Sequence, residues 1–131
     1  MKHRILVVDD EPQIRELLCM YLSQKGYLAS SAGSSEEALR RISEKQVDVV
    51  VLDIGLAGED GLQVLVSIKG VNPAIRVIML TGMGFVEDLL QEAQQKGADG
   101  YVSKVLPLDE LMLTVDRVLK QPKPCTVPVP G

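Results

Sequence analysis

A continuous run of β-branched and aliphatic residues near the middle of the chain ends at a single acid. The run reads VDVVVLDIG over residues 47–55, with Asp53 directly after its last leucine. Because its apolar residues are consecutive rather than alternating, the run is typical of a parallel strand that is covered on both faces. Asp53 and the glycines that follow it should then lie at the carboxyl edge of a sheet, where open α/β folds bind ligands.

Four further apolar runs alternate with helical patterns along the sequence. We predict strands at residues 5–8, 27–32, 47–53, 76–81 and 100–103. Apolar residues at helical spacing predict a helix after each strand, beginning near residues 12, 34, 62, 86 and 107. Strands that alternate with helices in this way pair in parallel through right-handed crossovers. The expected fold is an α/β three-layer (βα)5 sandwich.

Local signals mark several helix ends. Gly26 stands where a glycine commonly follows the end of a helix, and Ser34 and Glu37 have the spacing of a capping box. Gly70 and Pro73 are expected to end the third helix.

Length, charge and cysteine content narrow the class of protein. At 131 residues the chain fits one domain with a full core. A net charge of -4 with interspersed acids and bases disfavours a nucleic-acid surface. The first apolar run is too short for a signal peptide or a membrane span, so we expect a cytoplasmic protein. Cys19 and Cys125 lack metal or redox spacing and are predicted to be unpaired thiols.

Polar side chains follow four of the five predicted strands, and they should meet at one edge of the sheet. These residues are Asp9, Asp10, Asp53, Thr81 and Lys104. Three carboxylates so close together repel one another unless one is protonated or a cation neutralises them. Mg²⁺ fits best, because it binds carboxylates and water and leaves places for phosphoryl oxygens. A lysine and a threonine opposite could bind those oxygens, so the set predicts phosphoryl transfer onto an aspartate.

Four motifs occur in order along the chain: VVDDEP at 7–12, LDIGLAGEDG at 52–61, MLTG at 79–82 and GADGYVSK at 97–104. Together they resemble the receiver domain of bacterial two-component response regulators. The resemblance implies a flavodoxin-like fold with strand order 2-1-3-4-5. It also implies a receiver domain over residues 1–120, followed by a Pro-rich tail or linker at 121–131.

The resemblance further implies a phosphoacceptor and a metal site. Asp53 would accept a phosphoryl group from a sensor histidine kinase or phosphotransfer protein. Asp53, Asp10 and the backbone carbonyl of Gly55 would bind Mg²⁺ directly, and Asp9 would bind it through water. Ile14, Arg15 and Leu18 could help to dock the kinase, although Leu18 is about as well explained as a core residue.

A switch is implied by the same resemblance. Lys104 would neutralise the phosphoryl charge, Thr81 would hydrogen-bond it, and Tyr101 would turn inward as an aromatic switch. The face formed by the fourth helix, the fifth strand and the fifth helix would then change shape, with a homodimer through these two helices left open. This chain has Val105 where the family commonly has a proline after its lysine. A receiver-fold scaffold or binding module that acts without phosphorylation therefore stays as the alternative.

Two other functions fit the fold but not the residues. A flavin carrier would need a Ser/Thr/Gly-rich phosphate loop after the first strand, where this chain has Asp9, Asp10, Glu11 and Pro12. A phosphatase of the haloacid dehalogenase type would need a second acid two residues after its nucleophile, where this chain has Gly55. Both are disfavoured.

Overall fold

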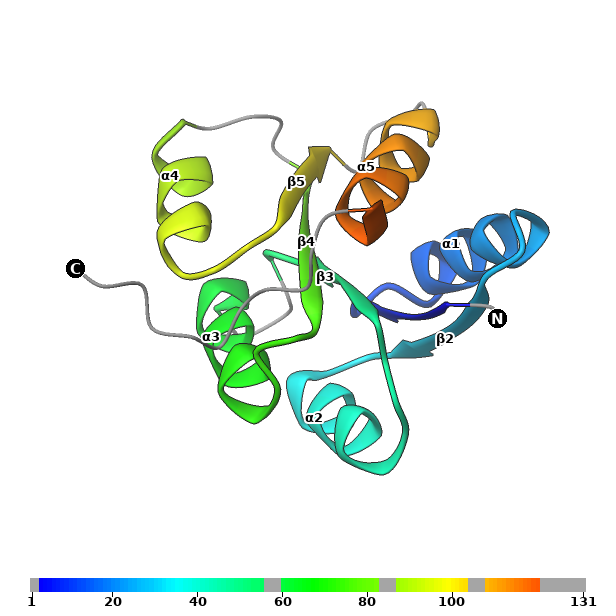
Figure 1. The fold of residues 1–131 in the computed structure, drawn as a ribbon, viewed down its shortest axis with the longest axis horizontal. Coiled ribbons are helices and arrows are strands. Elements are labelled where there is room, and N and C mark those ends of the chain that lie inside the picture. Colours follow the sequence, from blue (N-terminus) through cyan, green and yellow to red (C-terminus); the bar gives the residue numbers. More distant parts are fainter. Residues whose placement is uncertain (1–2, 56–59, 83–86, 104–107, 121–131) are drawn as a thin grey trace.

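The chain folds into five strands and five helices that alternate along the sequence (Figure 1). The computed structural model describes residues 3–55, 60–82, 87–103 and 108–120. The strands are β1 Arg4–Val8, β2 Leu28–Ala32, β3 Val49–Asp53, β4 Arg76–Thr81 and β5 Gly100–Ser103. The helices are α1 Pro12–Gln24, α2 Ser35–Glu44, α3 Gly61–Val71, α4 Glu87–Gln95 and α5 Asp109–Lys120. All strand pairs are parallel, in the order β2-β1-β3-β4-β5, which confirms the predicted fold and strand order.

Two separate hydrophobic cores lie on the two faces of the sheet. Helices α2, α3 and α4 pack on one face, and α1 and α5 pack on the other (Figure 1). Strand β3 lies at the centre and is buried along its whole length, as its unbroken apolar run predicted. The edge strand β2 is much more exposed, and Ala32 is the one residue of this strand that is buried.

Several element ends differ from the predictions by a residue or two. Strand β3 begins at Val49 instead of residue 47, and β2 begins at Leu28 instead of residue 27. Helix α3 continues through Gly70, which therefore does not end it, and closes at Asn72, whose N–H donates to the Ile68 carbonyl. The buried Ile68 side chain holds this last turn in the core, which outweighs the poor helix propensity of glycine.

The predicted helix signals at the start of α2 and the end of α1 are present. The Ser34 hydroxyl accepts a hydrogen bond from the Glu37 N–H at 3.2 Å. The Glu37 carboxylate accepts one from the Gly33 N–H at 2.7 Å, one residue before the position that a standard capping box uses. That bond is the main reason why the pKa of Glu37 is lowered. Gly26 has a φ of 94°, the left-handed conformation that favours glycine after a helix.

Of the two predicted unpaired thiols, only Cys19 lies within the described residues. Cys19 is a half-buried free thiol, whereas Cys125 falls outside the described residues. His3 is exposed, with its Nδ1 3.7 Å from an Asp48 carboxylate oxygen.

Among the described residues, no helix has both the length and the apolar character that crossing a membrane requires.

Candidate functional site

The register between β1 and β3 brings the first and third strand ends together. Val8 of β1 pairs with Leu52 of β3, so the next residue of each strand, Asp9 and Asp53, emerges at the same height. On the other side of β3, Asp53 pairs with Leu80, which places Thr81 one residue further along β4. The acids therefore come from adjacent paired strands.

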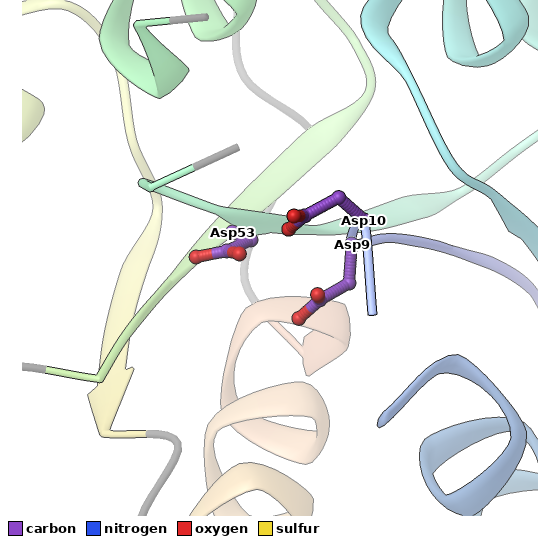
Figure 2. Close-up of side chains that lie close together, drawn as sticks. All are labelled: Asp9, Asp10 and Asp53. Atoms are coloured by element: carbon purple, nitrogen blue, oxygen red, sulfur yellow. The ribbon is translucent and has the colours of Figure 1, made fainter. Parts of the chain in front are cut away.

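Three carboxylates meet at this edge of the sheet (Figure 2). Asp9, Asp10 and Asp53 each offer an oxygen atom, and these oxygens all lie within 4.8 Å of one another. Asp9 has no exposed surface and Asp53 is 3% exposed, whereas Asp10 is partly exposed. Like charges at this separation and burial repel strongly, so the cluster favours a bound cation.

Two of the acids, Asp9 and Asp53, each stabilise the turn that follows them. The Asp9 Oδ1 accepts a hydrogen bond from the Glu11 N–H at 2.9 Å, and the Asp53 Oδ1 accepts one from the Gly55 N–H at 3.0 Å. Each is a tight turn closed by an aspartate onto the backbone two residues later. Arg15 fixes the first turn from the side, since its Nη1 donates to the Asp9 carbonyl at 2.7 Å. Both turns thus hold the carboxylates in place.

The cluster opens into a pocket of about 420 Å³. Its lining includes Asp10, Asp53, Gly55, Asp60 and Gly82. A Cβ atom at Gly55 would lie 3.8 Å from the Asp53 Oδ1, so the glycine leaves that side of the carboxylate open. The pocket therefore exposes an otherwise buried acid to an incoming reactant.

The donor set fits a small, hard divalent cation. With Mg–O distances of about 2.1 Å, two ligands of one ion lie about 3 Å apart when adjacent and about 4.2 Å apart when opposite. The three carboxylate oxygens lie within 4.8 Å of one another, so they are close enough to surround a single ion. Carboxylate oxygens are the ligands that Mg²⁺ prefers.

The remaining predicted site residues occupy different places. Thr81 is fully buried at the end of β4, beside Ser103 of β5. Tyr101 is half-buried on β5 opposite Met79, and it lines a separate cavity of about 260 Å³ together with residues of α4 and α5. Lys104 and its neighbour Val105 lie outside the described residues.

The proposed kinase-docking residues are not all on the surface. Leu18 is 4% exposed and packs in the core beneath α1 and α5, so of its two interpretations the core one is confirmed. Its helical position turns it toward the sheet. Ile14 and Arg15 are half-buried.

One contributor to the site was missed. Gly61 begins α3 directly behind the Asp53 turn, and its N–H donates to the Ile54 carbonyl at 3.1 Å. A Cβ atom there would come within 2.5 Å of the Ile54 Cα and 2.8 Å of the Asp53 carbonyl oxygen. Asp60, whose carboxylate accepts from the Leu62 N–H, caps α3 just before it, but a capping aspartate signals a helix start and not this close approach.

Comparison with known families agrees with this geometry. Residues 5–116 match the family described as the response regulator receiver domain. The chain belongs to this family. The receiver is 34% identical over 129 residues to the transcriptional regulatory protein GlrR of Escherichia coli K12, a match that covers 96% of this chain and 29% of GlrR. It thus spans less than a third of that relative's length.

Shorter relatives match over nearly their whole length. The receiver is 34% identical over 119 residues to the sporulation initiation phosphotransferase F of Bacillus subtilis, covering 91% of this chain and 95% of the relative. Among solved structures it is similar to the response regulator protein TrrA of Thermotoga maritima, in complex with Mg²⁺ and beryllofluoride. That match has a TM-score of 0.79 and 39% identity, and covers 90% of this chain and 99% of TrrA.

Proposed function

We propose that this receiver is a phosphorylation-dependent switch of a two-component system and that Asp53 is its phosphoacceptor. The observation that carries the proposal is the placement of Asp53. It is a 3% exposed carboxylate at the mouth of a pocket of about 420 Å³, within 4.8 Å of two further acids. A buried acid in such company is otherwise unfavourable for the fold.

The chemistry is a transfer from nitrogen to oxygen. A carboxylate oxygen of Asp53 attacks the phosphorus atom of a phosphohistidine on a sensor histidine kinase or phosphotransfer protein. The P–O bond forms as the P–N bond breaks, and the leaving imidazole nitrogen takes a proton from solvent. Water later attacks the acyl phosphate, which restores the carboxylate and releases inorganic phosphate. The open side of the acid at Gly55 gives both reactants access.

Mg²⁺ bound here would neutralise the acids and the charge that develops on the transferred group. We assign Asp10, Asp53 and the Gly55 carbonyl as direct ligands, and Asp9 as a ligand through water. The solved TrrA complex contains Mg²⁺ and beryllofluoride, which supports this assignment by similarity. Asp9 is fully buried, which suits a residue that binds the ion from the side facing the protein interior.

The response is a shift between two conformations. Thr81, at the strand end next to Asp53, hydrogen-bonds the new phosphoryl group, and Lys104 pairs with its charge. Tyr101 then turns inward, and the face made by α4, β5 and α5 changes shape. The cavity beside Tyr101, which residues of α4 and α5 also line, provides room for this rearrangement. We place the receiver at residues 1–120 and a linker or tail at 121–131.

A phosphorylation assay with matched variants tests the proposal. The receiver is incubated with Mg²⁺ and acetyl phosphate, and its intact mass is recorded beside Asp53→Asn and Asp88→Asn. Asp88 is an exposed acid in the first turn of α4 and controls for the loss of one carboxylate. We expect a phosphoryl adduct on wild type and Asp88→Asn, none on Asp53→Asn, and none when a chelator removes Mg²⁺.

A missing adduct on the wild-type protein has two explanations, and only one of them refutes the proposal. Beryllofluoride binding, followed by NMR, separates the two ways in which this could happen. Shifts at Thr81 and Tyr101 without an adduct would indicate a short-lived acyl phosphate, which a faster quench then detects. If neither treatment changes the protein, the receiver-fold scaffold that acts without phosphorylation is correct.

A further inference from the structure

A groove lies at the amino end of the sheet, opposite the acidic cluster. It has a volume of about 220 Å³ and is bounded by the first residues of β1 and β2 and the last turn of α2. Leu6 and Val8 of β1 face the core under α2, so Arg4, two residues before Leu6, begins on the same face. On β2, Leu28 and Ser30 share a face with the buried Ala32, yet both are exposed.

Basic side chains from three different segments converge on this groove. Arg4 comes from β1, Arg41 from the last turn of α2, and Lys45 from the residue that follows α2. The fourth charged residue of the lining is Glu44, so the lining carries a net charge of about +2 in a chain of net charge -4. The groove is therefore a local positive site on an acidic protein.

Within the described part of the chain, Arg4, Arg41 and Lys45 form no strong ion pair. Arg41 lies 3.7 Å from the Glu37 carboxylate, and the two side chains are 44% and 33% exposed, which makes a weak pair. The side chains of Arg4 and Lys45 form no hydrogen bond or ion pair with another described residue. The C-terminal end of α2 contributes only about half a negative charge, less than the excess of the lining.

Simple structural roles account for only part of this arrangement. A cation at a helix end complements the helix dipole, and charges beside an edge strand discourage strand addition. Neither role requires Arg4, which belongs to the inner strand β1 and lines the same groove as Arg41 and Lys45. The exposed Leu28, at 43%, adds an apolar floor beside the charges.

We propose that this groove binds a small organic phosphate, a phosphomonoester on a compact ring or aliphatic group. Arginine guanidinium groups bind phosphate oxygens in pairs, and a lysine ammonium adds a third donor. The non-phosphate part of the ligand lies on Leu28. The volume of about 220 Å³ suits a metabolite rather than a polymer, which would need a longer basic stripe.

NMR titration of the ¹⁵N-labelled receiver tests this site without relying on Asp53 chemistry. Adenosine monophosphate, adenosine and inorganic phosphate are each added without Mg²⁺. We expect saturable shifts at the amides of Ser30 and Lys45 with adenosine monophosphate, weaker ones with phosphate and none with adenosine. The same shifts are expected in Asp53→Asn, since the groove and the acids lie at opposite ends of the sheet.

Neighbouring arginines provide the matched control. Arg41→Gln removes a lining cation and should weaken adenosine monophosphate binding about tenfold, as expected for one charge-assisted contact. Arg40→Gln removes the same charge one residue away, outside the lining, and should leave binding within about twofold. Circular dichroism melts check that both variants fold like wild type. Absence of saturable shifts, or equal weakening by both variants, would overturn the proposal.

Discussion

Replacement of Gly61 by alanine is the sharpest test of how the backbone supports the Asp53 turn. The added Cβ would lie 2.5 Å from the Ile54 Cα, 2.6 Å from the Ile54 carbonyl oxygen and 2.8 Å from the Asp53 carbonyl oxygen. All three contacts are to main-chain atoms, which cannot rotate away as a flexible side chain would. Either α3 or the turn after β3 has to move.

The expected loss of stability follows from these contacts. Overpacking a tight site costs about 1–3 kcal/mol, and three backbone contacts place Gly61→Ala near the upper end. The better helix propensity of alanine returns at most about 1 kcal/mol. A net loss of about 2–3 kcal/mol lowers the Tm of a domain of this size by about 10 °C. The phosphorylation rate should fall too, because the turn that carries Asp53 is displaced.

Gly70→Ala is the matched control within the same helix. Apart from the backbone of its own helix and its chain neighbours, no described atom lies within 4 Å of a Cβ built at Gly70, so alanine there has open space. Its stability should rise by about 0.5–1 kcal/mol, since alanine is the better helix former. Thermal and urea denaturation measure both variants. If Gly61→Ala melts within about 2 °C of wild type, the close packing of α3 against the Asp53 turn is not a constraint.

Four further changes test other contacts by urea denaturation or titration. Lys69→Met removes the ammonium that lies 2.8 Å from the Asp99 carboxylate, in a pair whose side chains are 15% and 19% exposed. The free energy of unfolding should fall by about 2 kcal/mol. Lys96→Met, whose pair is longer and more exposed, should cost less than about 0.5 kcal/mol. Ser34→Ala removes the N-cap of α2 and should lower the free energy of unfolding by about 1 kcal/mol, without changing its dependence on urea concentration. The pKa of Tyr27 is raised to about 12 by burial and then by its hydrogen bond to Asp116, so this stabilisation is complete below pH 10 and lost between pH 10 and about 12. Absorbance titration of tyrosinate should show the late step, and Asp116→Asn should move it to lower pH.

The sequence predicted the fold because local and global signals agree in this chain. The unbroken apolar run of β3 requires cover on both faces, and two hydrophobic cores provide it. Strand and helix boundaries were less predictable where tertiary contacts decide them. Gly70 looks like a helix end in the sequence, but Ile68 is held in the core and keeps the last turn helical.

The site was predictable where chain order alone positions a residue. Asp9 and Asp53 end neighbouring strands, so their meeting follows from topology. Leu18 was ambiguous because a helical pattern gives spacing but not the rotation of the helix on the sheet, and the structure turns it inward. Gly61 could not be assigned from sequence, since its role depends on how closely α3 approaches the backbone of the Asp53 turn.

The backbone hydrogen bonds described for the acidic cluster do not depend on its negative charge. The apolar part of β3 is complete at Leu52, one residue before Asp53. The turns after Asp9 and Asp53 each use one side-chain oxygen to accept a backbone N–H, a bond that asparagine forms equally well. Asparagine would keep both turns and remove the repulsion between carboxylates whose oxygens lie within 4.8 Å. The negative charge is therefore not required by the turns, and it agrees with the cation site and the phosphoacceptor that we propose.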